Sequence, residues 1–171
     1  MPKKRVKKNK NQQSNGFFAA LKHYSTSRRV HFVMGLLLSF FTAYVGIALI
    51  SFIFTGAADQ SIVKNLKASD LILKKIEVSN WAGVRGAYIA DWVMNKWFGI
   101  SSFFLLFLLG SVGFKIMNIS SMHLFRRFIV CVALTVWSSV FLAFVSSYFN
   151  DSAFFYLGGQ HGYDVAEWLI G

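Results

Sequence analysis

The sequence contains very little cysteine, proline or acid. Cys131 is the only cysteine in 171 residues, so an intramolecular disulfide is excluded, and its place in an apolar run suits a small buried hydrophobe. Pro2 is the only proline and precedes every predicted helix, so bends in the helices must arise at glycine. Seven acidic residues stand against 18 basic ones, and the net charge is +11. Most of this positive charge lies in two segments and indicates the topology of the chain.

Residue patterns for nucleotide, metal or proton chemistry are also missing. The chain has no Gly-x-x-x-x-Gly-Lys-Ser/Thr, the pattern of a phosphate-binding loop. Its four histidines have no ligand spacing, so each is predicted to be an ordinary solvated side chain. The apolar runs hold no acid, lysine, arginine or histidine between their ends, where a transporter or proton pump needs one. We therefore predict no catalytic, cofactor-binding or metal-binding residues in this chain.

Three apolar runs are present, and apolar residues make up 55% of the sequence. The charge-free run 32–54 has 23 residues and the run 128–149 has 22, and at about 1.5 Å per residue each can cross a hydrocarbon core of about 30 Å. The middle run, 98–117, is shorter in its apolar part, but Trp97 and Lys115 can sit at the two interfaces. The sequence predicts an all-α integral membrane protein with three transmembrane helices in this chain.

The basic residues predict how these helices are oriented. Nine basic residues precede the first run, and the short connection between the second and third runs adds three more without any acid. Because short cytoplasmic loops are enriched in lysine and arginine, we expect both segments in the cytoplasm and the acidic tail after residue 150 outside. The residues predicted to set the topology are Lys3, Lys4, Arg5, Arg28, Arg29, Lys115, Arg126 and Arg127.

The chain divides into three regions on this pattern. Residues 1–16 are predicted to be a disordered basic cytoplasmic tail with affinity for anionic lipid, and residues 17–29 an amphipathic juxtamembrane segment. Residues 30–171 are predicted to form the membrane domain. Within it, 60–97 and 154–171 are too short and polar to span, and we expect them to lie as interfacial helices on the outer surface.

A ten-residue pattern, Gly-x-x-Gly-x-x-x-Ala-acid-Trp, occurs once in each of these outer segments. The first copy comprises Gly83, Gly86, Ala90, Asp91 and Trp92, and the second, 76 residues later, comprises Gly159, Gly162, Ala166, Glu167 and Trp168. The first copy leads directly into the apolar run 98–117. The repetition therefore predicts a fourth span beginning a few residues beyond Gly171, so that two units of helix, interfacial helix and helix make up the complete domain.

Small residues recur at helical spacing in two of the apolar runs. One stripe is formed by Gly35, Ser39 and Ala43, and the other by Ser139, Ala143 and Ser147. Such stripes allow helices to approach closely in lipid. We interpret them as packing positions within one subunit, and assembly between subunits remains an alternative.

Four segments of the chain carry a family resemblance: 55–60, 80–87, 97–103 and 157–162, with Asn80-Trp81-Ala82-Gly83 and Leu157-Gly158-Gly159 among them. They resemble the N-terminal four-helix membrane domain of the FtsK/SpoIIIE family of bacterial DNA translocases, over about residues 28–171. The resemblance implies a membrane anchor and assembly domain that tethers a cytoplasmic DNA-pumping ATPase at the division septum and couples chromosome segregation to cell division. The fourth span, the linker and the motor of that family are not among these residues.

The resemblance also implies a location and partners. It predicts a multipass protein of the bacterial cytoplasmic (inner) membrane with a cytoplasmic N-terminus. The implied partners are the lipid bilayer, further copies of the chain in a hexamer, and other membrane proteins of cell division, while DNA is contacted only by the missing motor and no cofactor is bound here. Two alternatives remain open: a small multipass subunit of a transporter or channel, and a membrane-bound sensor whose outer loop binds a ligand.

Overall fold

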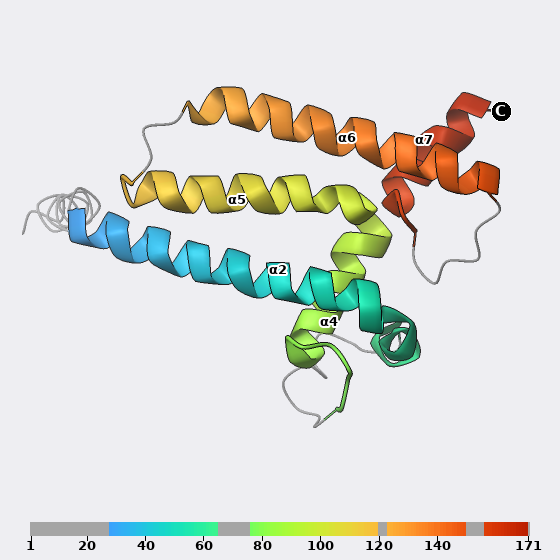
Figure 1. Cartoon of the computed structure of the whole chain (residues 1–171), viewed down its shortest axis with the longest axis horizontal. Helices are drawn as coiled ribbons and strands as arrows, with labels where there is room; N and C mark the ends of the chain where they lie inside the picture. The colour runs from blue at the N-terminus through green and yellow to red at the C-terminus, as the bar shows by residue number, and fades with distance from the viewer. Residues whose placement is uncertain (1–27, 65–75, 120–122, 150–155, 171) are drawn as a thin grey trace, which may run out of the picture.

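The computed structural model describes residues 28–64, 76–119, 123–149 and 156–170, arranged as Figure 1 shows. Within these ranges the regular structure is entirely helical, which confirms the all-α prediction. In order, the elements are α2 (Arg28–Lys64), α4 (Gly83–Asp91), the π-helix η1 (Trp92–Trp97), the 3₁₀ helix η2 (Gly99–Ser101), α5 (Ser102–Ile116), α6 (Leu124–Phe149) and α7 (Gly159–Ile170). The predicted basic tail, 1–16, lies outside the described residues, as does all but the end of the segment 17–29.

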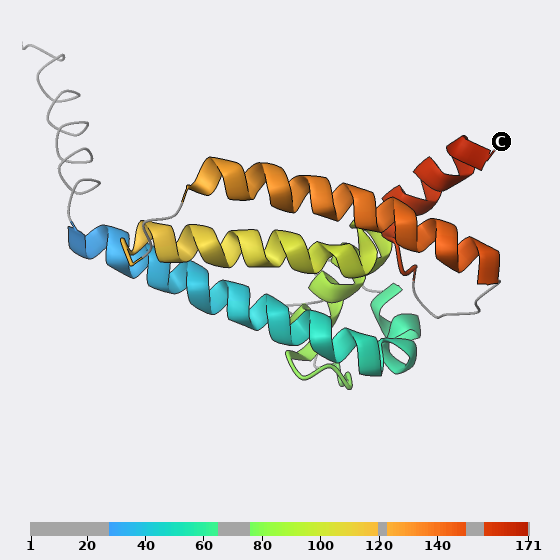
Figure 2. The ribbon, with the colours of Figure 1, turned by 45° about the horizontal axis from the view of Figure 1, so that its top comes forward.

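Three of these helical stretches are long and apolar enough to cross a membrane, judged by length and composition. They are α2, the combined η2 and α5 (Gly99–Ile116), and α6, so the prediction of three spanning helices is confirmed. The helix α5 packs on both α2 and α6 and lies between them, as Figures 1 and 2 show. Its direction is opposite to that of its two neighbours.

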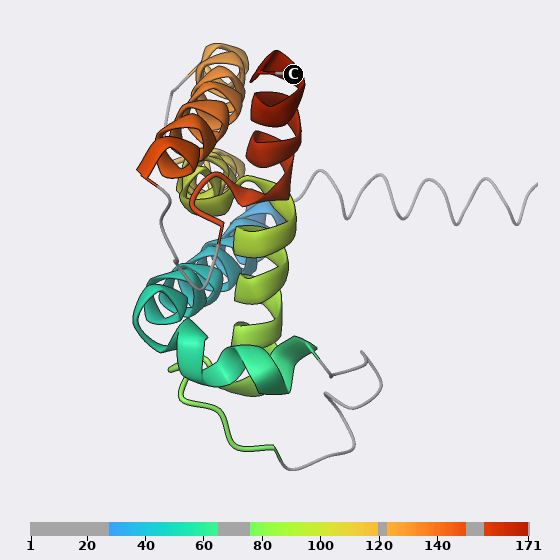
Figure 3. The same ribbon diagram turned by 90° about the vertical axis from the view of Figure 1, so that its right-hand side faces the viewer.

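The first helix is longer than the apolar run that predicted it. At 37 residues α2 has a length along the chain of about 55 Å, well beyond a hydrocarbon core of about 30 Å. Residues 60–64, predicted to begin the outer interfacial segment, are continuous with α2. Figure 3 shows that the C-terminal end of α2 bends away from its longer part. In the same part of the helix the Thr55 hydroxyl donates to the Ser51 carbonyl at 3.0 Å, and Gly56 follows. Both features favour a bend.

The third spanning helix also begins earlier than its apolar run. Arg126 and Arg127, expected in a loop, lie in the first turn of α6, because arginine is a good helix former and continues the helix past the apolar stretch. The Arg127 guanidinium donates to Ser111 Oγ of α5 at 3.1 Å and lies 5.8 Å from the ring centre of Phe107. We call this end of the three-helix layer, where α2 and α6 begin and α5 ends, the basic end.

The opposite end holds the two helices that contain the repeated motif, and we call it the motif end. Figure 3 shows α4 and α7 running across the long helices there, one after the other. The helix α4 packs on α2, α7 packs on α6, and α7 also contacts η1 and η2. The buried core lies where α2 meets α4 and η1, and consists of Val45, Ala48, Leu49, Phe52, Ala90 and Met94.

Away from this core, the long helices expose large apolar side chains. Phe40 of α2 is 66% exposed, and Phe125 and Trp137 of α6 are 77% and 65% exposed. Water disfavours an apolar surface of this extent, whereas lipid chains solvate it. The surface of the three long helices is therefore that of a lipid-embedded layer.

Candidate functional site: the paired motif helices

The two copies of the sequence motif begin their helices with the same backbone geometry. The first glycine of each copy has a positive φ, +70° at Gly83 and +68° at Gly159. In each case its N–H closes a turn, to the carbonyl of Asn80 at 2.8 Å and to that of Tyr156 at 2.9 Å. Glycine adopts a positive φ without the strain that a Cβ brings. The repeat seen in the sequence is thus a repeat of structure.

The second glycine of each copy packs against the spanning helix that precedes it. Both Gly86 and Gly162 are buried. A Cβ on Gly86 would lie 3.3 Å from Ala48 Cβ of α2, and one on Gly162 would lie 2.5 Å from the Ser139 carbonyl oxygen of α6. Ala90 and Ala166, one turn further on, are also buried. The small residues of the motif therefore form the face on which each motif helix crosses its spanning helix.

The acid and the tryptophan of the motif make different contacts in the two copies. Asp91 accepts a hydrogen bond from Asn95 Nδ2 at 2.7 Å, and Asn95 Oδ1 accepts one from the Tyr156 backbone N–H at 3.2 Å. The first copy's acid thus orients a side chain that holds the turn leading into the second copy. Trp92, 41% exposed, packs on Trp97, whereas Glu167 is exposed and Trp168 is 80% exposed.

The segment that follows the first copy meets the start of the second copy through the backbone, at what we call the glycine junction: residues 97–100 against residues 157–159. The Ile100 N–H donates to the Leu157 carbonyl at 3.0 Å. A Cβ on Gly99, whose φ is +62°, would lie 2.1 Å from the Leu157 oxygen, and one on Gly159 would lie 2.2 Å from the Trp97 oxygen. Only glycine allows backbones to approach this closely, so the junction depends on both positions. The rings of Phe98 and His161 pack beside it in a tilted arrangement, with their centres 4.9 Å apart.

A second polar contact fixes the segment that enters α4. Asp59, 2% exposed at the end of α2, accepts hydrogen bonds from the backbone N–H groups of Ser79 at 2.7 Å and Asn80 at 2.9 Å. Asn80, 4% exposed, donates from Nδ2 to the Ala48 carbonyl at 3.1 Å and accepts from the Ala82 N–H at 2.9 Å. We call Asp59 and Asn80 the entry clamp.

Sequence reasoning did not single out the entry clamp as a site. A signal was present, since Asp59 is the first acid of the chain and lies five residues after a long apolar run. An acid in that position is expensive to bury unless it is hydrogen-bonded, and its partners lie 20 and 21 positions further along the chain.

The two predicted stripes of small residues meet different partners. Gly35 and Ser39 lie at the crossing of α2 and α5, where a Cβ on Gly113 would be 2.7 Å from Ser39 Oγ. Ser139 and Ala143 lie against Gly158, just before α7, and Ser139 also lies against Gly162 of α7; the Ser139 hydroxyl donates to the Gly158 carbonyl. The last members of the stripes, Ala43 and Ser147, are exposed.

The residues predicted to set the topology lie together where the structure describes them. Arg28 and Arg29 begin α2, Lys115 lies in the last turn of α5, and Arg126 and Arg127 begin α6, all at the basic end. Lys3, Lys4 and Arg5 lie outside the described residues. Within the described ranges, no cluster of three or more histidine, cysteine, aspartate or glutamate side chains can hold a metal ion.

This geometry defines a class of protein: a helical membrane domain in which two motif helices are joined by glycine contacts at one end of a layer of spanning helices. The family model of the 4TM region of DNA translocase FtsK/SpoIIIE matches residues 27–171. The match covers most of the chain, so the chain belongs to this family and is a membrane domain of an FtsK/SpoIIIE-type translocase, as the resemblance predicted. No curated protein and no solved structure matches it.

Proposed function

We propose that this domain anchors the DNA-pumping motor of an FtsK-type translocase in the bacterial cytoplasmic membrane at the division septum, and so couples chromosome segregation to cell division. Membership of the translocase family supports the link to such a motor. The domain's own role is anchoring and assembly, without bond chemistry and without a cofactor, and the motor that contacts DNA follows the membrane domain after a fourth span and a linker.

The observation that carries the proposal is the separation of charge along the layer. No acid precedes Asp59 in the sequence, and no acid occurs between residues 92 and 150. Among the described residues, all the acids therefore belong to the motif end: Asp59, Glu77, Asp91, Asp164 and Glu167. The motif end also carries Lys64, Arg85 and Lys96, whereas the described part of the basic end carries five lysine and arginine side chains without an acid. Because positive charge is retained in the cytoplasm, this asymmetry supports a cytoplasmic basic end, the side on which DNA must be moved.

The motif end then faces outward and meets other membrane proteins of cell division, while the domain assembles with further copies of itself in a hexamer. Trp81 and Trp168 are 66% and 80% exposed on this end. Large exposed aromatic side chains are frequent anchors in protein interfaces. The entry clamp and the glycine junction hold the two motif helices in one fixed arrangement, which is what a docking platform needs.

Thiol labelling in spheroplasts tests the orientation. In a Cys131→Ser background, Glu167→Cys places a thiol on the exposed face of α7 and Ile119→Cys places one at the basic end, where Ile119 is 66% exposed. A membrane-impermeant maleimide is expected to label Glu167→Cys in intact spheroplasts and Ile119→Cys only after lysis. The reverse pattern would overturn the assigned orientation.

Fluorescence microscopy of the chain fused to a fluorescent protein tests the septal role. The fusion is expected to be enriched at the septum, and Trp168→Ala is expected to reduce that enrichment several-fold. Trp137→Ala is the matched control, because Trp137 is also 65% exposed but lies on the lipid-facing surface of α6. Uniform distribution of the unsubstituted fusion around the cell membrane would contradict a septal role.

A further inference from the structure

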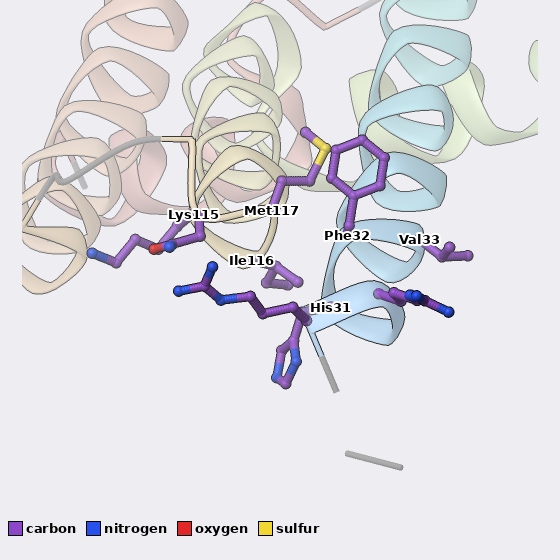
Figure 4. Close-up of a pocket in the computed structure, with 9 residues that line it drawn as sticks. His31, Phe32, Val33, Lys115, Ile116 and Met117 are labelled. Atoms are coloured by element: carbon purple, nitrogen blue, oxygen red, sulfur yellow. The ribbon is translucent and has the colours of Figure 1, made fainter. Parts of the chain in front are cut away.

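The basic end contains a hollow of about 910 Å³ between the first turn of α2 and the end of α5. It is lined by Arg28, Arg29, His31, Phe32 and Val33 of α2 and by Lys115, Ile116, Met117 and Asn118 of the α5 end. Figure 4 shows Lys115 on the α5 side and His31 on the α2 side, with Met117 and Phe32 directed toward one another between the two helices. The lining is therefore cationic at its rim and apolar in its middle.

The hollow exists because of how the two helices cross and end. They approach closely at Gly35, where a Cβ would lie 2.6 Å from the Gly113 carbonyl oxygen. Just beyond this crossing α5 ends at Ile116, and Asn118, with a φ of 59°, turns the chain away. The first turn of α2 continues past that point, so its side chains border a space that α5 does not fill.

Among the described residues, the hollow is lined by positive charges and by no acid. Arg28, Arg29 and Lys115 contribute three permanent positive charges, and no acid occurs in the described residues of α2 before Asp59 or anywhere in α5 and α6. Lys115, in the last turn of α5, offsets the partial negative charge at the C-terminus of that helix. Arginine is the side chain best suited to bind a phosphate, because its guanidinium donates two parallel hydrogen bonds.

We propose that this hollow is a discrete binding site for an anionic phospholipid of the adjoining leaflet. The lipid phosphate lies between the two arginines and Lys115, and the glycerol and the first acyl carbons lie over Phe32, Val33 and Ile116. The occupant is a lipid rather than a soluble phosphate because the middle of the site is apolar and continues into the lipid-facing surface, with Phe32 48% and Val33 51% exposed. Basic pockets between transmembrane helices are a recognised mode of binding such headgroups.

Native mass spectrometry of the whole chain, purified in a neutral detergent, tests the proposal. The probes are phosphatidylglycerol and phosphatidylcholine with identical acyl chains. The unsubstituted chain is expected to retain one phosphatidylglycerol in preference to phosphatidylcholine. The triple variant R28Q/R29Q/K115Q is expected to lose about a hundredfold in affinity for phosphatidylglycerol, since each basic residue near a membrane surface contributes about a fivefold factor.

A matched control separates this site from general attraction by positive charge. The variant K64Q/R85Q/K96Q also removes three positive charges, from exposed positions at the other end of the molecule. It is expected to bind phosphatidylglycerol with the same affinity as the unsubstituted chain. Equal affinities of the two triple variants would overturn the proposal, whether both keep the lipid or both lose it.

Two further measurements keep the result interpretable. If the triple variant does not fold, as judged by circular dichroism, the single variant K115Q leaves both arginines in place and is expected to lose about fivefold in affinity. Inorganic phosphate at millimolar concentration is expected not to displace the lipid. Displacement by phosphate, or an unchanged affinity in K115Q, would overturn the assignment of a phospholipid site.

Discussion

The close backbone approach at the glycine junction can be tested by adding a single methyl group. Gly159 and Gly83 hold the same place in the two copies of the motif and have nearly the same φ, +68° and +70°. Their surroundings differ. A Cβ on Gly159 would lie 2.2 Å from the Trp97 oxygen and 2.4 Å from the Gly99 nitrogen, whereas one on Gly83 would meet nothing within 4 Å. Gly159→Ala and Gly83→Ala therefore form a matched pair.

The expected losses of stability follow from these surroundings. Both variants place an alanine in the left-handed region, which costs about 1–2 kcal/mol, and both gain about 0.4–1 kcal/mol from a less flexible unfolded chain. Gly83→Ala is thus expected to lose about 1 kcal/mol. Gly159→Ala adds a collision with backbone that cannot move aside, of the order of 1–3 kcal/mol, and the loss of the hydrogen bond from Ile100 to Leu157, about 1 kcal/mol. Its total loss is expected to be about 3–4 kcal/mol.

Equilibrium unfolding in mixed micelles measures this difference. Sodium dodecyl sulfate is titrated into the protein in a mild detergent, and tryptophan fluorescence is followed, since Trp92 and Trp97 lie next to the junction. The free energy of unfolding is expected to fall by about 2–3 kcal/mol more for Gly159→Ala than for Gly83→Ala. Equal losses in the two variants, or a larger loss for Gly83→Ala, would refute the reasoning about the junction.

Two other contacts can be tested in the same assay, each with a control variant. Asp59→Asn replaces one carboxylate oxygen of the entry clamp by an amide group that faces a backbone N–H. This variant is expected to lower the free energy of unfolding by about 2–4 kcal/mol. Its control is Glu77→Gln, at an exposed acid nearby, which is expected to change the free energy of unfolding by less than about 0.5 kcal/mol. Ser139→Leu is expected to lower the free energy of unfolding by about 1–3 kcal/mol or more, because the larger side chain collides with Gly158 and with Gly162 of the second motif. Its control, Ser147→Leu at an exposed position, is expected to be nearly neutral. A small effect of Asp59→Asn, or similar effects of the two leucine variants, would contradict these contacts.

The spanning helices were predictable from the sequence, but their ends were not. A run such as 32–54 enters lipid because its own length and lack of charge suffice, whatever the rest of the chain does. Where the helix stops is a different matter. Residues 60–64 continue α2, and Arg126 and Arg127 continue α6, because backbone hydrogen bonding does not end at the membrane boundary.

The repeated motif was likewise visible in the sequence, while its contacts were not. The spacing of Gly83 and Gly159 identified two equivalent positions, and the structure gives both a positive φ. The spacing does not show that Gly159 packs against the backbone of another segment while Gly83 has open space beside it. Gly99 of the glycine junction and Asp59 of the entry clamp lie outside the motif, and neither was identified from the sequence as a site residue.

The amino-acid sequence by itself determined which segments enter lipid, at which end the positive charge collects, and where the repeated glycines begin their helices. These properties follow from the cost of placing each segment in hydrocarbon and from the conformational freedom of single residues, which act locally. Only the tertiary structure decided that Asp59 holds residues 79 and 80, that the segment after the first motif copy meets the start of the second backbone to backbone, and that a cationic hollow opens beside the crossing of α2 and α5. These contacts join residues between 20 and about 90 positions apart, and they depend on how the helices cross rather than on any one segment.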